Sequence, residues 1–220
     1  MLQSATLKFL TQLKKNNNRP WFEKNRKVYE AAKSDFLLLT DDLIKQVSKF
    51  DSSIGGLVAK DCTFRINRDV RFSKDKSPYK NNMAGYFNKH GKKGLGAGYY
   101  LHIEPGKSFV AGGIWMPEAA VLSKIRQELD YDLDDWKKIL NNKNFKKQFP
   151  EGMDTTDSLI RPPKGYDENN PAIDFIKMKS FVVRRSFSDG EVLDNGFAKK
   201  IAGTFEAMKP MLDFLNRAVE

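Results

Sequence analysis

The sequence predicts an α+β protein in which N- and C-terminal helices pack on one face of a largely antiparallel sheet. Both end regions carry apolar residues at helical spacing, whereas the middle contains alternating and hairpin-like segments. No repeat, low-complexity segment or obvious linker divides the 220 residues. We therefore expect a single domain over residues 1–220.

The N-terminal region predicts two helices. The first covers residues 4–15, with Ser4 or Thr6 as its N-cap. The second begins at Pro20, because the missing N–H of proline is not needed at a first helical position, and continues to about Phe50. Its apolar face repeats at helical steps, at Trp21, Val28, Ala32, Phe36, Leu39, Leu43 and Val47.

The middle of the chain predicts strands. Alternation over residues 62–67 buries one face and leaves Arg65 and Asn67 together on the polar face. Residues 68–83 lack any period and are expected to form a loop, and a strand resumes near residues 85–88. Residues 99–115 have the pattern of a β-hairpin that turns at Pro105-Gly106-Lys107.

The C-terminal region predicts further helices around one strand. Helices are expected over residues 117–129, from Trp136 to Leu140, and over a short segment from Pro171 to Met178. Residues 141–158 are polar and are expected to be irregular. Residues 180–187 form a strand with Arg184 on its polar face. A last helix begins near Phe197, and Pro210 should kink or divide it.

Composition narrows the class of protein. The formal net charge is +10, and no segment is apolar for the length of a membrane span. Cys62 is the single cysteine, so no internal disulfide can form, and one Cys with two His makes a structural zinc site a poor interpretation. The first residues lack a signal-peptide pattern. We expect a cytoplasmic protein without a membrane partner.

Basic residues concentrate in one stretch. Arg65 to Lys93 contains nine basic and two acidic residues, a net +7, whereas Glu118 to Asp135 has two basic and six acidic residues, a net −4. Arginine offers a planar fork of donors and lysine a mobile charge, which together suit phosphate or carboxylate. The alternative is a solvated loop whose charges pair locally, for example Arg71 with Asp75.

Two nearby features are candidate parts of a site. The glycine-rich stretch Lys89 to Gly98 could surround phosphate with backbone N–H groups, helped by Lys92 and Lys93, but a flexible hairpin connection is the favoured interpretation. His102 and Glu104 share a strand face with Tyr100, a pattern compatible with acid–base chemistry or with a structural histidine.

The run Arg68-Asp69-Val70-Arg71-Phe72-Ser73-Lys74-Asp75-Lys76-Ser77-Pro78-Tyr79-Lys80 resembles the signature of a widespread, largely bacterial family of uncharacterised proteins of about this length. The hairpin from Gly98 to Trp115 and the loop Pro163-Lys164-Gly165-Tyr166 are also similar to that family. The resemblance covers nearly the whole chain. The family is a domain of unknown function, so the resemblance implies no activity, cofactor or catalytic residue.

Three hypotheses follow. The first is a pocket for an anionic, phosphate-bearing ligand, in which Arg68, Arg71 and Lys76 converge. Such a pocket could belong to an enzyme or only bind the ligand. The second is a nucleic-acid-binding surface with Tyr79 or Tyr86 stacking on bases. The third is a structural or protein-interaction domain. The sequence assigns no catalytic residue, cofactor, metal site or oligomeric state. The expected ligand residues are Arg65, Asn67, Arg68, Arg71, Lys74, Lys76, Tyr79, Lys80, His102 and Arg184.

Overall fold

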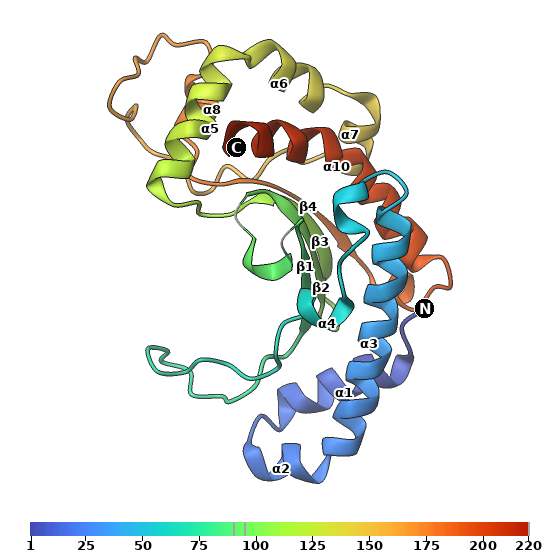
Figure 1. Cartoon of the computed structure of the whole chain (residues 1–220). Helices are drawn as coiled ribbons and strands as arrows, with labels where there is room; N and C mark the ends of the chain where they lie inside the picture. The colour runs from blue at the N-terminus through green and yellow to red at the C-terminus, as the bar shows by residue number, and fades with distance from the viewer. Residues whose placement is uncertain (90, 95, 220) are drawn as a thin grey trace. The chain divides into compact units, whose positions relative to one another are not determined.

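A computed structural model describes residues 1–89, 91–94 and 96–219 of the protein. It confirms the α+β class, with helices and one antiparallel four-stranded sheet in the order β1-β2-β3-β4 (Figure 1). The strands are β1 Met83–Phe87, β2 Gly98–Ile103, β3 Ser108–Ile114 and β4 Phe181–Phe187. None of the described helices is both long and apolar enough to cross a membrane.

The chain forms two compact units. Unit 1 consists of Met1–Lys93, Tyr100–Val110 and Ser186–Gly203. Unit 2 consists of Gly94–Tyr99, Ala111–Arg185 and Thr204–Glu220.

Unit 1 begins with α1, Ser4–Lys15, as the apolar spacing predicts. Neither expected residue caps it with a side chain. The N-cap is Gln3, and the Oγ1 of Thr6 instead donates to Asp35 Oδ2 on α3. The N–H of Gln3 donates to the same carboxylate oxygen at 2.8 Å, so Asp35 holds the start of α1 against α3. Figure 1 shows α1 beside α3.

The single helix predicted from Pro20 to Phe50 is two helices, α2 Arg19–Lys24 and α3 Arg26–Val47. The break lies at Asn25, whose Nδ2 donates to the carbonyl of Trp21 at 2.8 Å and thereby satisfies the end of α2. Because α3 starts anew, Val28 lies outside the predicted buried face and is 47% exposed. The later members of that face are buried, at Ala32, Phe36, Leu39, Leu43 and Val47.

A short 3-10 turn, η1 Ser52–Ile54, and a short helix, α4 Ala59–Cys62, follow α3. The strand predicted over residues 62–67 is not a regular strand. Thr63 and Asn67 form isolated bridges to Gly85 and Tyr79, and no continuous ladder joins them. Ile66 is buried as predicted, but Phe64 is 40% exposed. The alternation therefore marks an extended segment that forms β-bridges only near its two ends, at Thr63 and Asn67.

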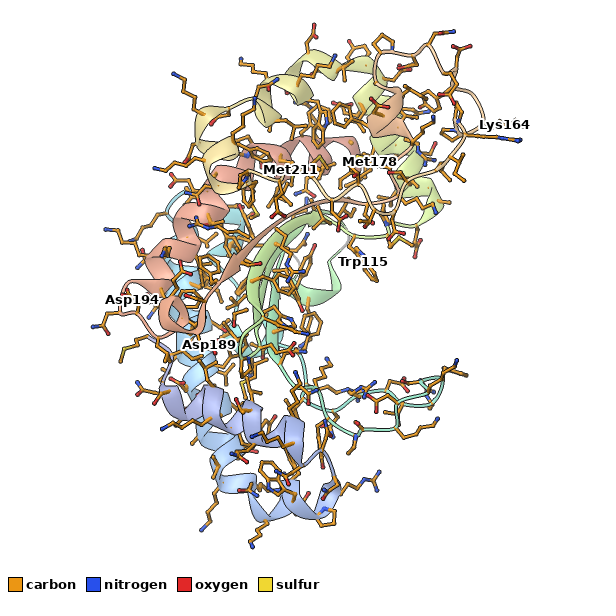
Figure 2. The ribbon with its side chains drawn as sticks, turned by 180° about the vertical axis from the view of Figure 1, so that it is seen from behind. Trp115, Lys164, Met178, Asp189, Asp194 and Met211 are labelled. Carbon is orange, nitrogen blue, oxygen red and sulfur yellow. The ribbon has the colours of Figure 1, made fainter. Side chains whose placement is uncertain are left out.

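The predicted hairpin is confirmed as β2 and β3. Gly106 adopts φ 72° in its turn, a conformation that favours glycine. The N–H of Gly106 also donates to Asp189 Oδ1 at 2.8 Å, from the short helix α9 Asp189–Val192 that follows β4. Asp189 is labelled in Figure 2. The glycine-rich stretch before β2 contains the 3-10 turn η2 Gly91–Lys93, while His90 and Leu95 lie outside the described residues.

Unit 2 contains the helices α5 Ala119–Tyr131, α6 Leu133–Leu140, α7 Lys143–Gln148 and α8 Ile173–Ile176. The acidic residues Asp134 and Asp135 occupy the first turn of α6, as predicted. Residues 141–158 were expected to be irregular, but α7 forms there. Asn142 caps α7, and Phe145 and Phe149 are buried with their ring centroids 5.1 Å apart.

The final helix, α10 Phe197–Val219, continues through Pro210, so the expected division does not occur. Its buried residues bind it into the core. In unit 2 the ring of Phe205 lies 4.7 Å from that of Tyr99 on β2. Met211 of α10 and Met178, both buried, are labelled in Figure 2 among the side chains of unit 2. Packing of the apolar stripe outweighs the hydrogen bond that proline removes from the helix.

Candidate functional site

We call residues 65–80 the basic arm. It consists of two extended segments of unit 1 that run side by side (Figure 1). The N–H of Arg68 donates to the carbonyl of Pro78 at 2.9 Å, and that of Lys80 donates to the carbonyl of Ile66 at 2.8 Å. Asn67 is exposed and bridges to Tyr79 through its backbone. The arm is therefore a short ribbon and not an unstructured loop.

Arg68 is tied to the opposite segment of the arm. Its guanidinium forms an ion pair with Asp75 and donates to the carbonyl of Ser77 at 3.2 Å. Hydrogen bonds from Ser77, and then from Arg68, lower the pKa of Asp75 to about 2. These contacts fix the width of the ribbon and use much of the hydrogen-bonding capacity of Arg68.

Arg71 and Lys76 also have partners within the arm. Arg71 pairs with Asp69 through two hydrogen bonds, Nε to Oδ1 at 3.0 Å and Nη2 to Oδ2 at 2.7 Å. The ammonium of Lys76 donates to the carbonyl of Val70 at 3.0 Å. The structure thus does not gather Arg68, Arg71 and Lys76 around one point. Local pairing occurs as the alternative interpretation held, with Asp69 rather than Asp75 as the partner of Arg71.

The tip of the arm is exposed. Phe72 is 96% exposed, and the guanidinium of Arg71 lies 5.8 Å from the centroid of its ring. Lys74 is also exposed. The tip thus presents an apolar ring with cationic side chains beside it.

Tyr79 has a structural position. Its ring is 5% exposed and stacks on Phe22 of α2, with centroids 4.0 Å apart and planes at 15°. Asn17 fixes its backbone, donating from Nδ2 to the carbonyl at 2.9 Å and accepting from the N–H at 3.1 Å. The stacking face expected for a ligand is therefore occupied by a protein ring.

Lys80 and Phe64 lie at the base of the arm. The ammonium of Lys80 lies 5.3 Å from the centroid of Phe64, within the range of a cation–π contact. Burial, and after it the charge of Arg65, lowers the pKa of Lys80. The Phe64 ring in turn lies 6.4 Å from that of Tyr100 on β2.

We call Tyr100, His102 and Glu104 the polar row, since alternate residues of β2 and the turn after it share one face. Tyr100 Oη lies 3.2 Å from His102 Nδ1, and His102 Nε2 lies 3.3 Å from Glu104 Oε2. The imidazole stacks on Phe109, with centroids 4.6 Å apart and planes at 19°. Three polar side chains are thus hydrogen-bonded in series.

Arg184, the remaining expected ligand residue, lies in unit 2 on the exposed face of β4. Hydrogen bonds from Thr156, and to a smaller extent the charge of Arg184, lower the pKa of Asp154. Arg184 is therefore surrounded by residues of unit 2, whereas the other nine expected ligand residues belong to unit 1.

A groove of about 300 Å³ lies in unit 1 beside α3, and we call it the α3 groove. Its polar lining includes four cationic side chains, Lys33, Lys60, Arg65 and Lys92. None of the described residues that line the groove carries a carboxylate. The remaining lining residues are polar or apolar: Tyr29, Phe36, Leu37, Thr63, Phe64, Ile66, Asn82 and Met83.

The contacts of these cations differ. Lys92 Nζ donates to the carbonyl of Thr63 at 2.9 Å, which places the ammonium at the groove wall. Lys33 lies 3.9 Å from Glu30, and both side chains are about half exposed, so this pair holds the lysine weakly. Like charges brought together around a concave surface attract an anion, because the anion relieves their mutual repulsion.

Cys62 is buried, and it directly precedes Thr63 of the α3 groove. Burial, and after it the charge of Asp61, raises the pKa of the thiol to about 11. The thiolate is the reactive form, so Cys62 is unsuited to nucleophilic chemistry at neutral pH. No group of three or more metal-ligating side chains occurs among the residues that are described.

The sequence pattern does not predict that Lys33 and Lys60 line a site. Lys33 is one polar residue on the outer side of an amphipathic helix, and Lys60 precedes the expected strand. Neither position differs in pattern from an ordinary surface lysine. Lys92 was singled out for its glycine-rich surroundings, and Arg65 for the basic run. Tertiary contacts bring these four together, and only the last two carried a sequence signal.

The family described as Conserved hypothetical protein (DUF2461) matches residues 5–214 of the chain. No curated protein and no solved structure matches this chain.

Proposed function

The chain belongs to the DUF2461 family of conserved hypothetical proteins, and we propose that it binds a small anionic, phosphate-bearing ligand in the α3 groove. The observation that carries this proposal is the lining: four cationic side chains and no carboxylate around about 300 Å³. That volume is at the lower end of the roughly 300–1,000 Å³ of small-molecule sites.

The donors of the groove suit a phosphate. Arg65 offers a planar fork for two oxygens, while Lys33 and Lys60 add mobile charges and the hydroxyl of Tyr29 adds a neutral donor. The apolar lining beside them lowers the local dielectric and strengthens each charge-assisted hydrogen bond.

Thermal unfolding with and without inorganic pyrophosphate, at matched ionic strength, tests the proposal. A ligand that binds the folded state at 100 times its Kd stabilises by about 2.7 kcal/mol. For a chain of this size that raises Tm by roughly 5–11 °C. Phosphate and a nucleoside monophosphate extend the panel of anions.

Lys60→Ala and Lys33→Ala should each remove most of this increase. Lys27→Ala is the matched control, because Lys27 is an exposed lysine of α3 that does not line the groove. An unchanged Tm for the parent protein with all anions would contradict the proposal. An equal loss in Lys27→Ala would show that the effect is a general one of net charge.

The exposed tip of the arm favours a second candidate, binding of single-stranded nucleic acid. Phe72 could stack on a base while Arg71, Lys74 and Lys76 contact phosphates. Asp69 and Asp75 offset part of the positive charge there. We therefore expect weak, non-specific binding that is lost at physiological salt. The logarithm of the binding constant should fall against the logarithm of the salt concentration with a slope of about −0.7 per phosphate contact. Tight binding to a defined DNA or RNA at that salt would place this candidate first.

A further inference from the structure

We propose that the polar row of β2 is an acid–base site whose reactive atom is the phenolic oxygen of Tyr100. The hydrogen bonds run in series from Tyr100 through His102 to Glu104. Anion binding in the α3 groove makes no use of this row, and neither His102 nor Glu104 lines the groove. The inference therefore adds a chemical activity to unit 1 and stands independently of the proposed function.

The direction of the hydrogen bonds follows from the chemistry of the partners. An ionised Glu104 can only accept, so the hydrogen between it and His102 lies on Nε2. In a neutral imidazole the other nitrogen, Nδ1, then carries a lone pair. The Tyr100 hydroxyl must donate to that lone pair, and His102 is placed to act as the base for Tyr100.

Neighbouring side chains hold the row in place. Phe109 covers one face of the imidazole, and the side chains of His102 and Glu104 are only 12% and 17% exposed. The ammonium of Lys14 on α1 lies 3.6 Å from Glu104 Oε1, whereas His102 contacts the other carboxylate oxygen, Oε2. A base whose orientation is fixed by a third group is the recurring arrangement of activated nucleophiles.

The surroundings of Tyr100 indicate the class of substrate. The exposed ring of Phe64 offers an apolar surface 6.4 Å from the Tyr100 ring, and Lys80 places a positive charge over Phe64. A flat apolar group next to a negative or strongly polar electrophilic centre would match both features.

An aryl sulfonyl fluoride is a probe of this chemistry. The oxygen of Tyr100 forms an O–S bond, the S–F bond breaks, and fluoride leaves. The phenolic proton passes to Nδ1 of His102. No oxidant or other reactant is needed.

Burial raises the pKa of Tyr100, so without base assistance it should react more slowly than the 90% exposed Tyr131. Tyr131 is therefore an internal reference in the same chain. Peptide mapping by mass spectrometry at pH 7 should show Tyr100 modified faster than Tyr131, because general-base assistance of about 100-fold or more outweighs the slowing by burial. Equal labelling, or faster labelling of Tyr131, would overturn the proposal.

Variants separate a base from a packing role. His102→Ala should remove the advantage of Tyr100 over Tyr131, and added imidazole should restore part of it. Glu104 acts through His102 as a positioning residue, so Glu104→Gln should slow labelling and Glu104→Asp should recover part of the rate. A His102→Ala protein that labels Tyr100 as the parent does would refute the relay.

The substrate class has its own readout. The ratio of Tyr100 to Tyr131 labelling cancels the intrinsic reactivity of each probe. It should be higher for benzenesulfonyl fluoride than for methanesulfonyl fluoride if the Phe64 surface binds a flat apolar group. A higher ratio for the smaller probe would refute that class.

Discussion

The ring of Tyr79 is stacked on Phe22, with centroids 4.0 Å apart and planes at 15°. This contact joins the end of the basic arm to the N-terminal helices of unit 1. It explains why a tyrosine inside a basic run is 5% exposed, and it predicts a structural role for a residue that the sequence suggested as a ligand contact.

Tyr79→Ala should lower the free energy of unfolding by about 3–5 kcal/mol, the usual effect of truncating a buried aromatic ring. Tyr79→Phe keeps the stack and should change it little. Chemical denaturation measures both values. Phe72→Ala is the control, since its ring is 96% exposed and its loss should stay within about 0.5 kcal/mol. A Tyr79→Ala protein as stable as the parent would show that the stack is dispensable.

Arg71→Ala should leave the melting temperature nearly unchanged. The Arg71 side chain is 76% exposed and pairs with a carboxylate that is itself about half exposed, so solvent screens the pair and it adds little to stability. Because Arg71 does not line the α3 groove, stabilisation by pyrophosphate should also persist. Loss of that stabilisation would instead support a ligand bound by the arm, as the sequence hypothesis of converging cations requires.

Glu191 should make stability depend on pH. It caps α9 through Ser188 and pairs with Lys200 at 2.7 Å, and the bond from Lys200, followed by that from Ser188, lowers its pKa to about 2. A depressed carboxyl pKa stabilises the folded state above the unfolded value near 4.5, and the contribution is lost as the pH falls towards 2. Because the Glu191 side chain is 36% exposed, solvent screens much of this effect, and Glu191→Gln should cost about 1 kcal/mol at pH 7 and almost nothing at pH 2.

Urea unfolding of the parent and of Glu191→Gln across this range measures the difference. The exposed Glu151 provides a matched control, and Glu151→Gln should change the free energy of unfolding only slightly, as surface substitutions do. If the cost of Glu191→Gln were the same at pH 7 and pH 2, the ionised carboxylate would not be its source.

Two glycines should respond in opposite directions to alanine. Gly113 has φ 128°, and a Cβ there would lie 1.8 Å from the carbonyl oxygen of Phe181, a backbone atom that cannot move aside. Gly113→Ala should therefore unfold the protein or lower Tm sharply. Gly203 lies inside α10 with open space around its Cβ position, so Gly203→Ala should stabilise by about 0.5–1 kcal/mol. Thermal melts compare the two, and a similar Tm for both variants would contradict the backbone argument.

Sequence periodicity recovered the elements whose apolar faces are continuous. Helix α1, the hairpin of β2 and β3, and β4 lie close to the predicted limits, because one buried face fixes each of them. The break between α2 and α3 was missed, since asparagine side chains cap the helices without disturbing the apolar spacing. Residues 62–67 alternate, yet only Thr63 and Asn67 form β-bridges and no continuous ladder joins them, because strand pairing is a tertiary property that alternation does not report.

The candidate sites were recovered in part. Arg65 is predictable because it belongs to the basic run, and His102 because it shares a strand face with Tyr100 and Glu104. Lys33 and Lys60 join Arg65 only because α3 and α4 pack beside the segment from Thr63 to Ile66. The acidic residues of the arm were visible from the start, but which arginine each one neutralises depends on the turn geometry of the ribbon.

The burial of Cys62 has a practical consequence for spectroscopy. The sequence contains no other cysteine, and a thiol with a pKa of about 11 labels slowly under native conditions. A cysteine introduced at the fully exposed position of Phe72 would then be the fast-reacting thiol of the molecule. A nitroxide or fluorophore attached there would report movement of the arm when pyrophosphate enters the α3 groove, without prior removal of the native thiol.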